Sequence, residues 1–189
     1  MHSIEPYYRW RDYYIASDDL CSPFYGREYS EFEFTDHIYD FVLHPQWDDI
    51  GSHTLFIKIL FAEYEKGFAV IELIGEWNDL LYNDIMILKR DIIDLMIHEG
   101  INKFILVGEN VLNFHYSDEE YYNEWFDDIE EGWVIGLNFR NHVIEEMKTA
   151  QIDYYINLGG KFQTLNWRTF SPPRLFEHLD ELVTKRLQV

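Results

Sequence analysis

Polar side chains that could bind a ligand follow the predicted strands of this 189-residue chain. In open α/β sheets, ligands bind beyond the carboxyl ends of the parallel strands, where helix N-termini also point. Several residues at these positions are amides, which donate and accept hydrogen bonds and therefore suit a neutral polar ligand or a peptide backbone. The candidate ligand-binding residues are Glu76, Trp77, Asn78, Glu109, Asn110, Arg140, Asn141 and His142, with Asn157 beside Gly159 as a further position.

Each of these residues has a chemical and a structural interpretation. Glu76 and Glu109 could act as an acid–base pair, and Arg140 could hold a carboxylate by two hydrogen bonds. The asparagines could instead cap helices or turns, Trp77 could pack beneath the following helix, and Arg140 could pair with an internal carboxylate. Carboxylates are also favoured near helix N-termini without any catalytic role. Both interpretations stay open, and we assign no catalytic residue.

Nucleophilic, phosphate-binding and metal-dependent chemistry have little support in the sequence. Cys21 is the single cysteine, so no internal disulfide can form, and no histidine is adjacent to it. The chain has no G-x-S-x-G elbow, Walker loop or G-x-G-x-x-G fingerprint, and the glycine pair at 159–160 alone does not indicate a phosphate cradle. The eight histidines are scattered, and His115 with the acidic residues at 118–119 is the nearest approach to a metal cluster. We therefore predict neither a metal nor a cofactor.

Hydrophobic periodicity predicts the elements that position these side chains. Residues 54–64 and 68–74 predict two strands joined by a short turn that contains Gly67, which is typical of an antiparallel hairpin. The clearest helix of the chain follows, and Gly100 supplies its C-cap. The apolar stripe of this helix consists of Leu81, Ile85, Leu88, Ile92 and Met96.

The rest of the chain continues to alternate between strands and helices. Strands are expected at 103–107, 133–139 and 152–158, and helices at 117–131, 142–150 and 171–187. Ser117 and Glu120 have the spacing of a capping box. The alternation predicts an α/β fold with a mixed, mostly parallel sheet flanked by helices. The residues expected to end neighbouring strands that run the same way are Gly75, Gly108, Phe139 and Leu158.

The first fifty residues differ from the rest because they are rich in aromatic rings and lack a helical stripe. Two short strands are expected there, at 31–34 and 38–43. The rings either tie this segment to the core or form a surface for a protein partner, since tyrosine and tryptophan also dominate binding hot spots. We expect a single domain over 1–189, in which the extension at 1–50 packs on an α/β core at 54–187.

The core resembles a SpoIIAA-like (STAS-type) domain in the order of its elements. The residues that carry the resemblance are the turn Ile74-Gly75-Glu76-Trp77-Asn78-Asp79 before the helix at 85–96, the strands at 104–107 and 134–138, and the helix at 142–150. The resemblance implies a domain that binds proteins, nucleotides or lipids and is not an enzyme. The segment 108–118 matches the region of the phosphorylatable serine in anti-sigma-antagonist members. It contains Ser117 but no run of small residues, so the phosphoswitch is not carried over. The whole chain is also similar to a bacterial family that implies no activity.

The charge balance excludes several classes of partner. With 15 Lys+Arg and 35 Asp+Glu, the formal net charge is −20, which repels nucleic acids and anionic membranes. The sequence has no apolar run long enough to span a bilayer and no secretory signal pattern, so we expect a cytoplasmic protein.

The leading functional hypothesis is a non-enzymatic regulatory module that binds another protein. Its candidate surfaces are the aromatic N-terminal region and the acidic helix at 117–131. One alternative is a small-molecule-binding protein or an enzyme with a polar site at the strand ends. Another is an acidic inhibitor of a basic partner, of the immunity-protein type. The sequence leaves the oligomeric state open.

Overall fold

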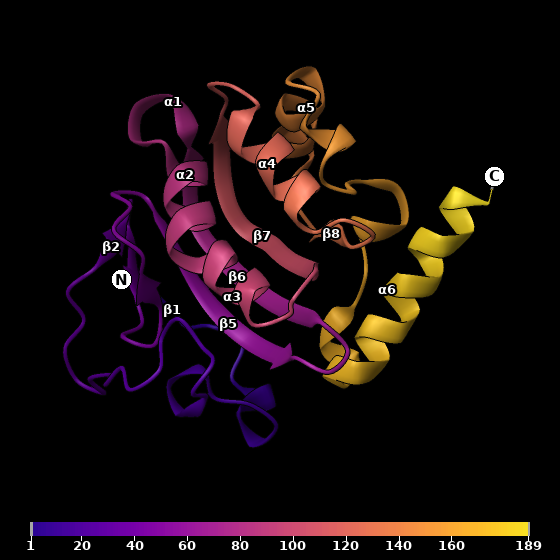
Figure 1. Ribbon diagram of the computed structural model, residues 1–189. Helices are drawn as coiled ribbons and strands as arrows, with labels where there is room; N and C mark the ends of the chain where they lie inside the picture. Colours follow the sequence, from indigo (N-terminus) through magenta and orange to yellow (C-terminus); the bar gives the residue numbers. More distant parts are fainter. Residues whose placement is uncertain (1, 189) are drawn as a thin grey trace.

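A five-stranded sheet forms the centre of the protein, described here for residues 2–188 by a computed structural model (Figure 1). The expected hairpin is confirmed, because its two strands pair antiparallel. Glu63 pairs with Phe68 beside the turn, and Leu55 pairs with Gly75 at the far end of the ladder. In spatial order the strands are β4 (Asp48–Asp49), β5 (Leu55–Glu63), β6 (Phe68–Asn78), β7 (Lys103–His115) and β8 (Trp133–Leu137).

The prediction of a mostly parallel sheet is wrong, because the two kinds of pairing are equally numerous. β4–β5 and β5–β6 are antiparallel, whereas β6–β7 and β7–β8 are parallel. The strand expected at 152–158 is instead a 3-10 turn, η4 (Ile152–Tyr154), followed by a single bridge between Asn157 and Ile135. Gln151 has a φ of 60°, so the chain turns sharply just before η4 and does not run extended beside β8.

Helices cover one face of this sheet (Figure 1). Most of the predicted stripe is confirmed, since Ile85, Leu88, Ile92 and Met96 are at most 2% exposed. Leu81 is 70% exposed because the short α1 (Asp79–Tyr82) ends at Asn83, which adopts the left-handed conformation. The layer then consists of α2 (Asp84–Leu88), the π-helical turn η3 (Lys89–Ile93), α3 (Asp94–His98), α4 (Glu120–Asp128) and α5 (Asn141–Thr149).

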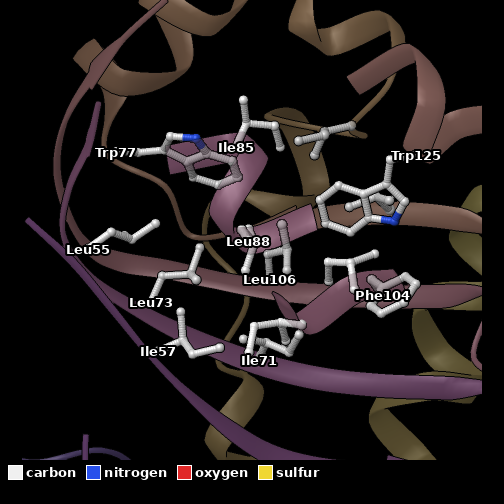
Figure 2. Packing of buried hydrophobic residues seen from close by; sticks show 14 of the residues in the cluster. Leu55, Ile57, Ile71, Leu73, Trp77, Ile85, Leu88, Phe104, Leu106 and Trp125 are labelled. Carbon is white, nitrogen blue, oxygen red and sulfur yellow. The ribbon is translucent and has the colours of Figure 1, made fainter. Parts of the chain in front are cut away.

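The apolar core between this layer and the sheet is shown in Figure 2. Aliphatic side chains of the strands meet Ile85 and Leu88 of α2, and Trp125 of α4 stands edge-on to Phe104 at 5.3 Å between ring centroids. Burial of each such side chain contributes about 1.5–3 kcal/mol. This core is therefore the main source of stability, and it fixes the helices relative to β6 and β7.

The opposite face is covered by α6 (Pro172–Leu187) and by residues 2–47, which we call the strap. Trp10 and Trp47 anchor the strap on this face, whereas Phe24 packs into the core of the helix-covered face, and all three are at most 5% exposed. In contrast, Tyr13 and Phe32 are 62% and 87% exposed. The strap contains β1 (His2–Ile4), η1 (Arg9–Asp12), η2 (Ala16–Asp18), β2 (His37–Ile38) and β3 (Phe41–Leu43), and its strands form a small sheet in the order β1-β3-β2.

Two details of the strap differ from the prediction. The strand expected at 31–34 is wrong, since these exposed residues form a bend and an irregular loop. The strand expected at 38–43 is broken into β2 and β3, because Tyr39 has a φ of 51° and turns the chain back. None of the helices between residues 2 and 188 is both long and apolar enough to cross a membrane.

β6 and β7 extend well past their predicted ends, so Gly75 and Gly108 lie inside strands and that prediction is wrong. A Cβ on Gly75, whose φ is 115°, would stand 1.9 Å from the carbonyl oxygen of Thr54, so this bend requires glycine. β8 stops at Leu137, two residues before Phe139. Residues 108–115 of β7 therefore overhang β8. Several candidate ligand-binding residues lie on this overhang rather than in loops.

Candidate functional site

The three candidates at the end of β6 have different surroundings. Trp77 is fully buried in the helix-side core, and its Nε1 donates to Oδ1 of Asp79 at 3.0 Å. Asn78 is 4% exposed and caps α1, because its Oδ1 accepts the backbone N–H of Leu81 at 2.9 Å. Both residues thus have the structural role that was the alternative to ligand binding. Glu76 remains partly exposed beside a cavity of about 140 Å³, where it accepts hydrogen bonds from Tyr39 and Asn113.

Glu109 on β7 is an anchored anion. Its carboxylate accepts Nη2 of Arg168 at 2.7 Å, Nε1 of Trp167 at 2.8 Å and Nδ2 of Asn138 at 3.0 Å. Burial alone would raise the pKa of Glu109, but the hydrogen bonds from Arg168, Asn138 and Trp167 outweigh it and lower that pKa below its ordinary value. The residue therefore fastens the segment before α6 to the sheet and is poorly suited to act as a base.

The candidates at the start of α5 cover the open edge of β7. Nε of Arg140 donates to the carbonyl oxygen of Glu109 at 3.2 Å, and Nε2 of His142 donates to the carbonyl oxygen of Leu112 at 2.6 Å. A strand edge without a neighbour leaves backbone groups unpaired, and these side chains pair with two of them in place of an extension of β8. Asn141 accepts a hydrogen bond from Gln163 in the loop before α6.

The overhang brings only some of the candidates together. Asn110 and Arg140 share a cavity of about 190 Å³, whose other lining residues are apolar. Glu76 pairs in register with Asn113, four residues beyond Glu109 on β7, which places the two glutamates on the order of 13 Å apart along the strand. They therefore do not form an acid–base pair. Asn157 lies at its bridge to β8, where its Nδ2 donates to the carbonyl oxygen of Val134 at 3.0 Å.

A row of charged side chains beneath the strap was not foreseen from the sequence. We define this buried charge row as Asp48 on β4, Lys58 on β5 and Glu72 on β6, which are 0%, 8% and 2% exposed. Lys58 and Glu72 lie directly opposite each other in the β5–β6 ladder. Each interrupts a run of apolar residues that predicts a buried strand, so the signal was present in the sequence.

Asp48 and Lys58 form one end of the row. Oδ1 of Asp48 accepts Nη1 of Arg27 at 2.9 Å and the hydroxyl of Tyr29 at 2.6 Å. Nζ of Lys58 lies 3.7 Å from Oδ2 of Asp48 and 4.0 Å from the centroid of the Tyr29 ring. Burial raises the pKa of Asp48 and lowers that of Lys58, and their mutual attraction opposes both shifts. The strap thus supplies Arg27 and Tyr29 as partners for charges on the sheet.

Glu72 forms the other end of the row. Its Oε2 accepts the backbone N–H of Tyr7 at 2.8 Å, which ties the start of the strap to the middle of β6. Burial raises the pKa of Glu72 to about 7, although the Tyr7 hydrogen bond and the charge of Arg168 lower it. Near neutral pH this carboxyl is therefore divided between its protonated and ionised forms.

The outer side of α4 presents acidic and aromatic groups to solvent. Phe126 is 40% exposed, and its ring centroid lies 5.7 Å from that of Tyr154, which is 71% exposed. The capping box predicted for Ser117 and Glu120 is wrong, because α4 begins at Glu120. The backbone N–H of Glu120 donates to Oδ1 of Asp118 at 3.1 Å instead. We define the α4 acidic surface as the exposed residues Asp118, Glu119, Glu120, Asp127, Glu130 and Glu131.

Two basic residues pair with two further acids of α4, Asp128 and Glu124. Nζ of Lys89, on the π-helical turn, is fully buried and lies 2.7 Å from Oδ2 of Asp128. Arg90 forms two hydrogen bonds to Glu124, at 2.6 and 2.8 Å. Across the part of the chain that the structure describes, the six residues of the α4 acidic surface have no such cation. The surface is therefore rigidly mounted and carries uncompensated negative charge.

Neither a metal-binding cluster nor a known relative points to a function for the described chain. No group of three or more His, Cys, Asp or Glu side chains within residues 2–188 is arranged to hold a metal ion. No protein-family model and no curated protein matches the sequence.

Proposed function

We propose that this protein is a non-catalytic module that binds a basic segment of another protein through the α4 acidic surface. The observation that carries the proposal is the six exposed carboxylates without a paired cation beside the exposed rings of Phe126 and Tyr154. Carboxylates crowded on one surface repel each other, and a cationic partner removes that repulsion. Exposed aromatic rings add contact area at low conformational cost.

The mounting of α4 supports recognition rather than simple solubility. Lys89 and Arg90 neutralise the carboxylates of Asp128 and Glu124 and link α4 to the preceding helix. The carboxylates of the α4 acidic surface are thus presented on a fixed helix, so that little conformational entropy of this helix is lost when a partner binds. An acidic inhibitor of a basic protein would use the same chemistry with a tighter fit.

We further propose that residues 54–187 belong to the SpoIIAA-like class and act in the cytoplasm. The order β5, β6, helix, β7, α4, β8, α5 supports this assignment, as does the glycine at position 75 shortly before the first helix. The single cysteine Cys21 fits a reducing compartment. Binding of another protein is the role that such a domain would have.

The test is a titration of a fluorescein-labelled peptide of alternating lysine and tryptophan residues, followed by anisotropy. The triple variant Glu120→Gln, Asp127→Asn, Glu131→Gln should weaken binding about 10-fold, because it removes half of the surface charge. The control Glu31→Gln, Glu65→Gln, Glu177→Gln removes three exposed charges elsewhere and should change affinity by less than about 2-fold. Equal losses in both triple variants would refute the assigned surface, since the attraction would then come from net charge alone.

A further inference from the structure

Basic side chains gather around two glycines at the edge of the sheet beyond β8. The backbone N–H of Asn138 donates to the carbonyl oxygen of Phe162 at 2.8 Å, so the loop with Gly159 and Gly160 lies against the carboxyl end of β8. Nζ of Lys148 is 3.7 Å from the position that a Cβ would take at Gly159. Nη2 of Arg186 is 3.5 Å from the corresponding position at Gly160. Cations from α5 and α6 thus reach the same loop.

The loop and the last turns of α6 enclose an open groove of about 600 Å³. Its α6 side is formed by residues three and four apart, which share one helix face. The guanidinium carbon of Arg186 lies 5.0 Å from the centroid of the buried Phe162 ring, an arrangement that orients this side chain. The groove is lined by Gly160, Lys161, Phe162, Leu182, Lys185 and Arg186.

Several backbone donors in the same loop have no hydrogen-bond partner in the described chain, and two of them belong to Gly160 and Lys161, which line the groove. The carbonyl oxygens of Gly159 and Gly160 accept the N–H groups of Phe162 and Gln163, at 3.1 and 3.2 Å. In contrast, the N–H groups of Gly159, Gly160 and Lys161 have no acceptor among the described residues. Unpaired donors next to cationic side chains favour an anion.

The local charge is positive although the protein as a whole carries −20. Lys185 has Glu181 at 3.8 Å, but Lys148, Lys161 and Arg186 pair with no carboxylate in the described chain. The C-termini of α5 and α6 each contribute about −0.5 elementary charge, which leaves roughly +2 around the loop and the adjoining groove together. Cations are favoured near helix C-termini, which accounts separately for Lys148 on α5 and for Lys185 and Arg186 on α6. They do not explain Lys161, or why all four cations converge on one loop.

We propose that this groove binds the phosphoryl group of a small phosphorylated molecule. A guanidinium can bind two phosphate oxygens at once, lysines add point charges, and the loop N–H groups supply further donors. The acidic remainder of the surface repels a long polyanion, so the ligand is a compact one and not a nucleic acid. The site is separate from the α4 acidic surface and does not depend on the proposed protein partner.

The probe for this site is inorganic pyrophosphate, titrated into the full chain by calorimetry in a buffer without divalent cations. We expect saturable binding to one site. The variant Lys161→Gln, Arg186→Gln should weaken that binding at least about 10-fold, because it removes two direct charged contacts. The control Lys66→Gln, Arg174→Gln changes two exposed cations elsewhere and should weaken it less than about 2-fold.

Amide NMR shifts provide a second measurement that does not depend on the substitutions. Pyrophosphate should shift the amide signals of Gly159, Gly160 and Lys161 more than the other signals of the chain. The proposal is overturned if pyrophosphate gives no saturable binding. It is equally overturned if both double variants weaken binding to the same degree, or if the largest shifts fall outside the loop.

Discussion

The two faces of the central sheet are buried by different means. The face beneath α2, α4 and α5 is closed by aliphatic and aromatic side chains. Its buried charged residues lie at the end of β6, at the start of α2 and on the π-helical turn, and they are Asp79, Asp84 and Lys89. The face beneath the strap carries Lys58 and Glu72 in the middle of the ladder. Both faces bury apolar area, but the second also buries two charges in its ladder, and the strap supplies partners for that buried charge row. The predictions below test this difference, from the largest expected effect to the smallest.

Removal of a large ring from the helix-covered face should cause the greatest loss of stability. Trp77→Ala leaves a cavity and removes a donor to Asp79, so we expect the free energy of unfolding to fall by about 3–5 kcal/mol. Urea unfolding followed by far-ultraviolet circular dichroism measures the change. Tyr13→Ala on the strap, at a residue 62% exposed, is the matched control and should change stability by less than about 0.5 kcal/mol. Similar losses in the two variants would contradict the assignment of the main core to the helix-covered face.

The strap-covered face should respond to pH through Glu72. Its pKa of about 7 lies above the ordinary value of 4.5, so between these two values the folded state holds a proton that the unfolded chain has lost. Stability from this group is therefore present at low pH and is lost as the pH rises towards 7 and above. Between pH 5 and 8 the wild type should lose about 2 kcal/mol relative to Glu72→Gln, which keeps an acceptor for the N–H of Tyr7.

Denaturant unfolding of both proteins at several pH values checks this expectation. The difference between them isolates Glu72 from the other titrating groups. Asp79→Asn provides the comparison on the helix-covered face, where burial also raises the pKa of Asp79 to about 7. Parallel stability curves for the wild type and Glu72→Gln would show that Glu72 titrates normally.

The pair at the other end of the buried charge row should show dependence on its partner. Lys58→Met leaves Asp48 buried with only Arg27 as a nearby cation, and we expect a loss of about 2 kcal/mol. Adding Asp48→Asn removes the uncompensated charge and should recover about 1 kcal/mol. A double variant less stable than Lys58→Met would mean that packing, and not charge, explains the loss.

The smallest effect should come from the edge of β7. Arg140→Ala removes the hydrogen bond to the carbonyl oxygen of Glu109, and we expect a loss of about 0.5–1 kcal/mol. Arg174→Ala at an exposed position of α6 serves as the control and should be neutral within about 0.5 kcal/mol. A loss as large as that of Lys58→Met would place Arg140 in the core of the fold instead of at its edge.

Much of the helix-covered face could be predicted from the sequence, because its pattern is local. The spacing of Ile85, Leu88, Ile92 and Met96 predicts one buried helical face, and the glycine turn between residues 64 and 68 predicts the hairpin. The failures arise where distant residues decide the outcome. The segment 152–158 is apolar enough for a strand, but the turn at Gln151 leaves it only a single bridge to β8.

The candidate site was predicted less well for the same reason. The edge residues were placed by assuming short strands, and the long β6 and β7 put Trp77 in the core and Glu109 opposite Arg168. Lys58 and Glu72 stand out in their strands as single charges within apolar runs. Their partners, Asp48 and the N–H of Tyr7, come from segments whose placement no local pattern reveals.

The overhang of β7 has a consequence for self-association. Between Gly108 and His115 the strand lacks a neighbour on one side, and such an edge can template the addition of a second chain. Here the side chains of Arg140, His142 and Glu146 form hydrogen bonds with backbone groups of β7 that an incoming strand would need. An incoming strand would have to displace these hydrogen bonds, so we expect the first turns of α5 to hinder strand addition along this edge.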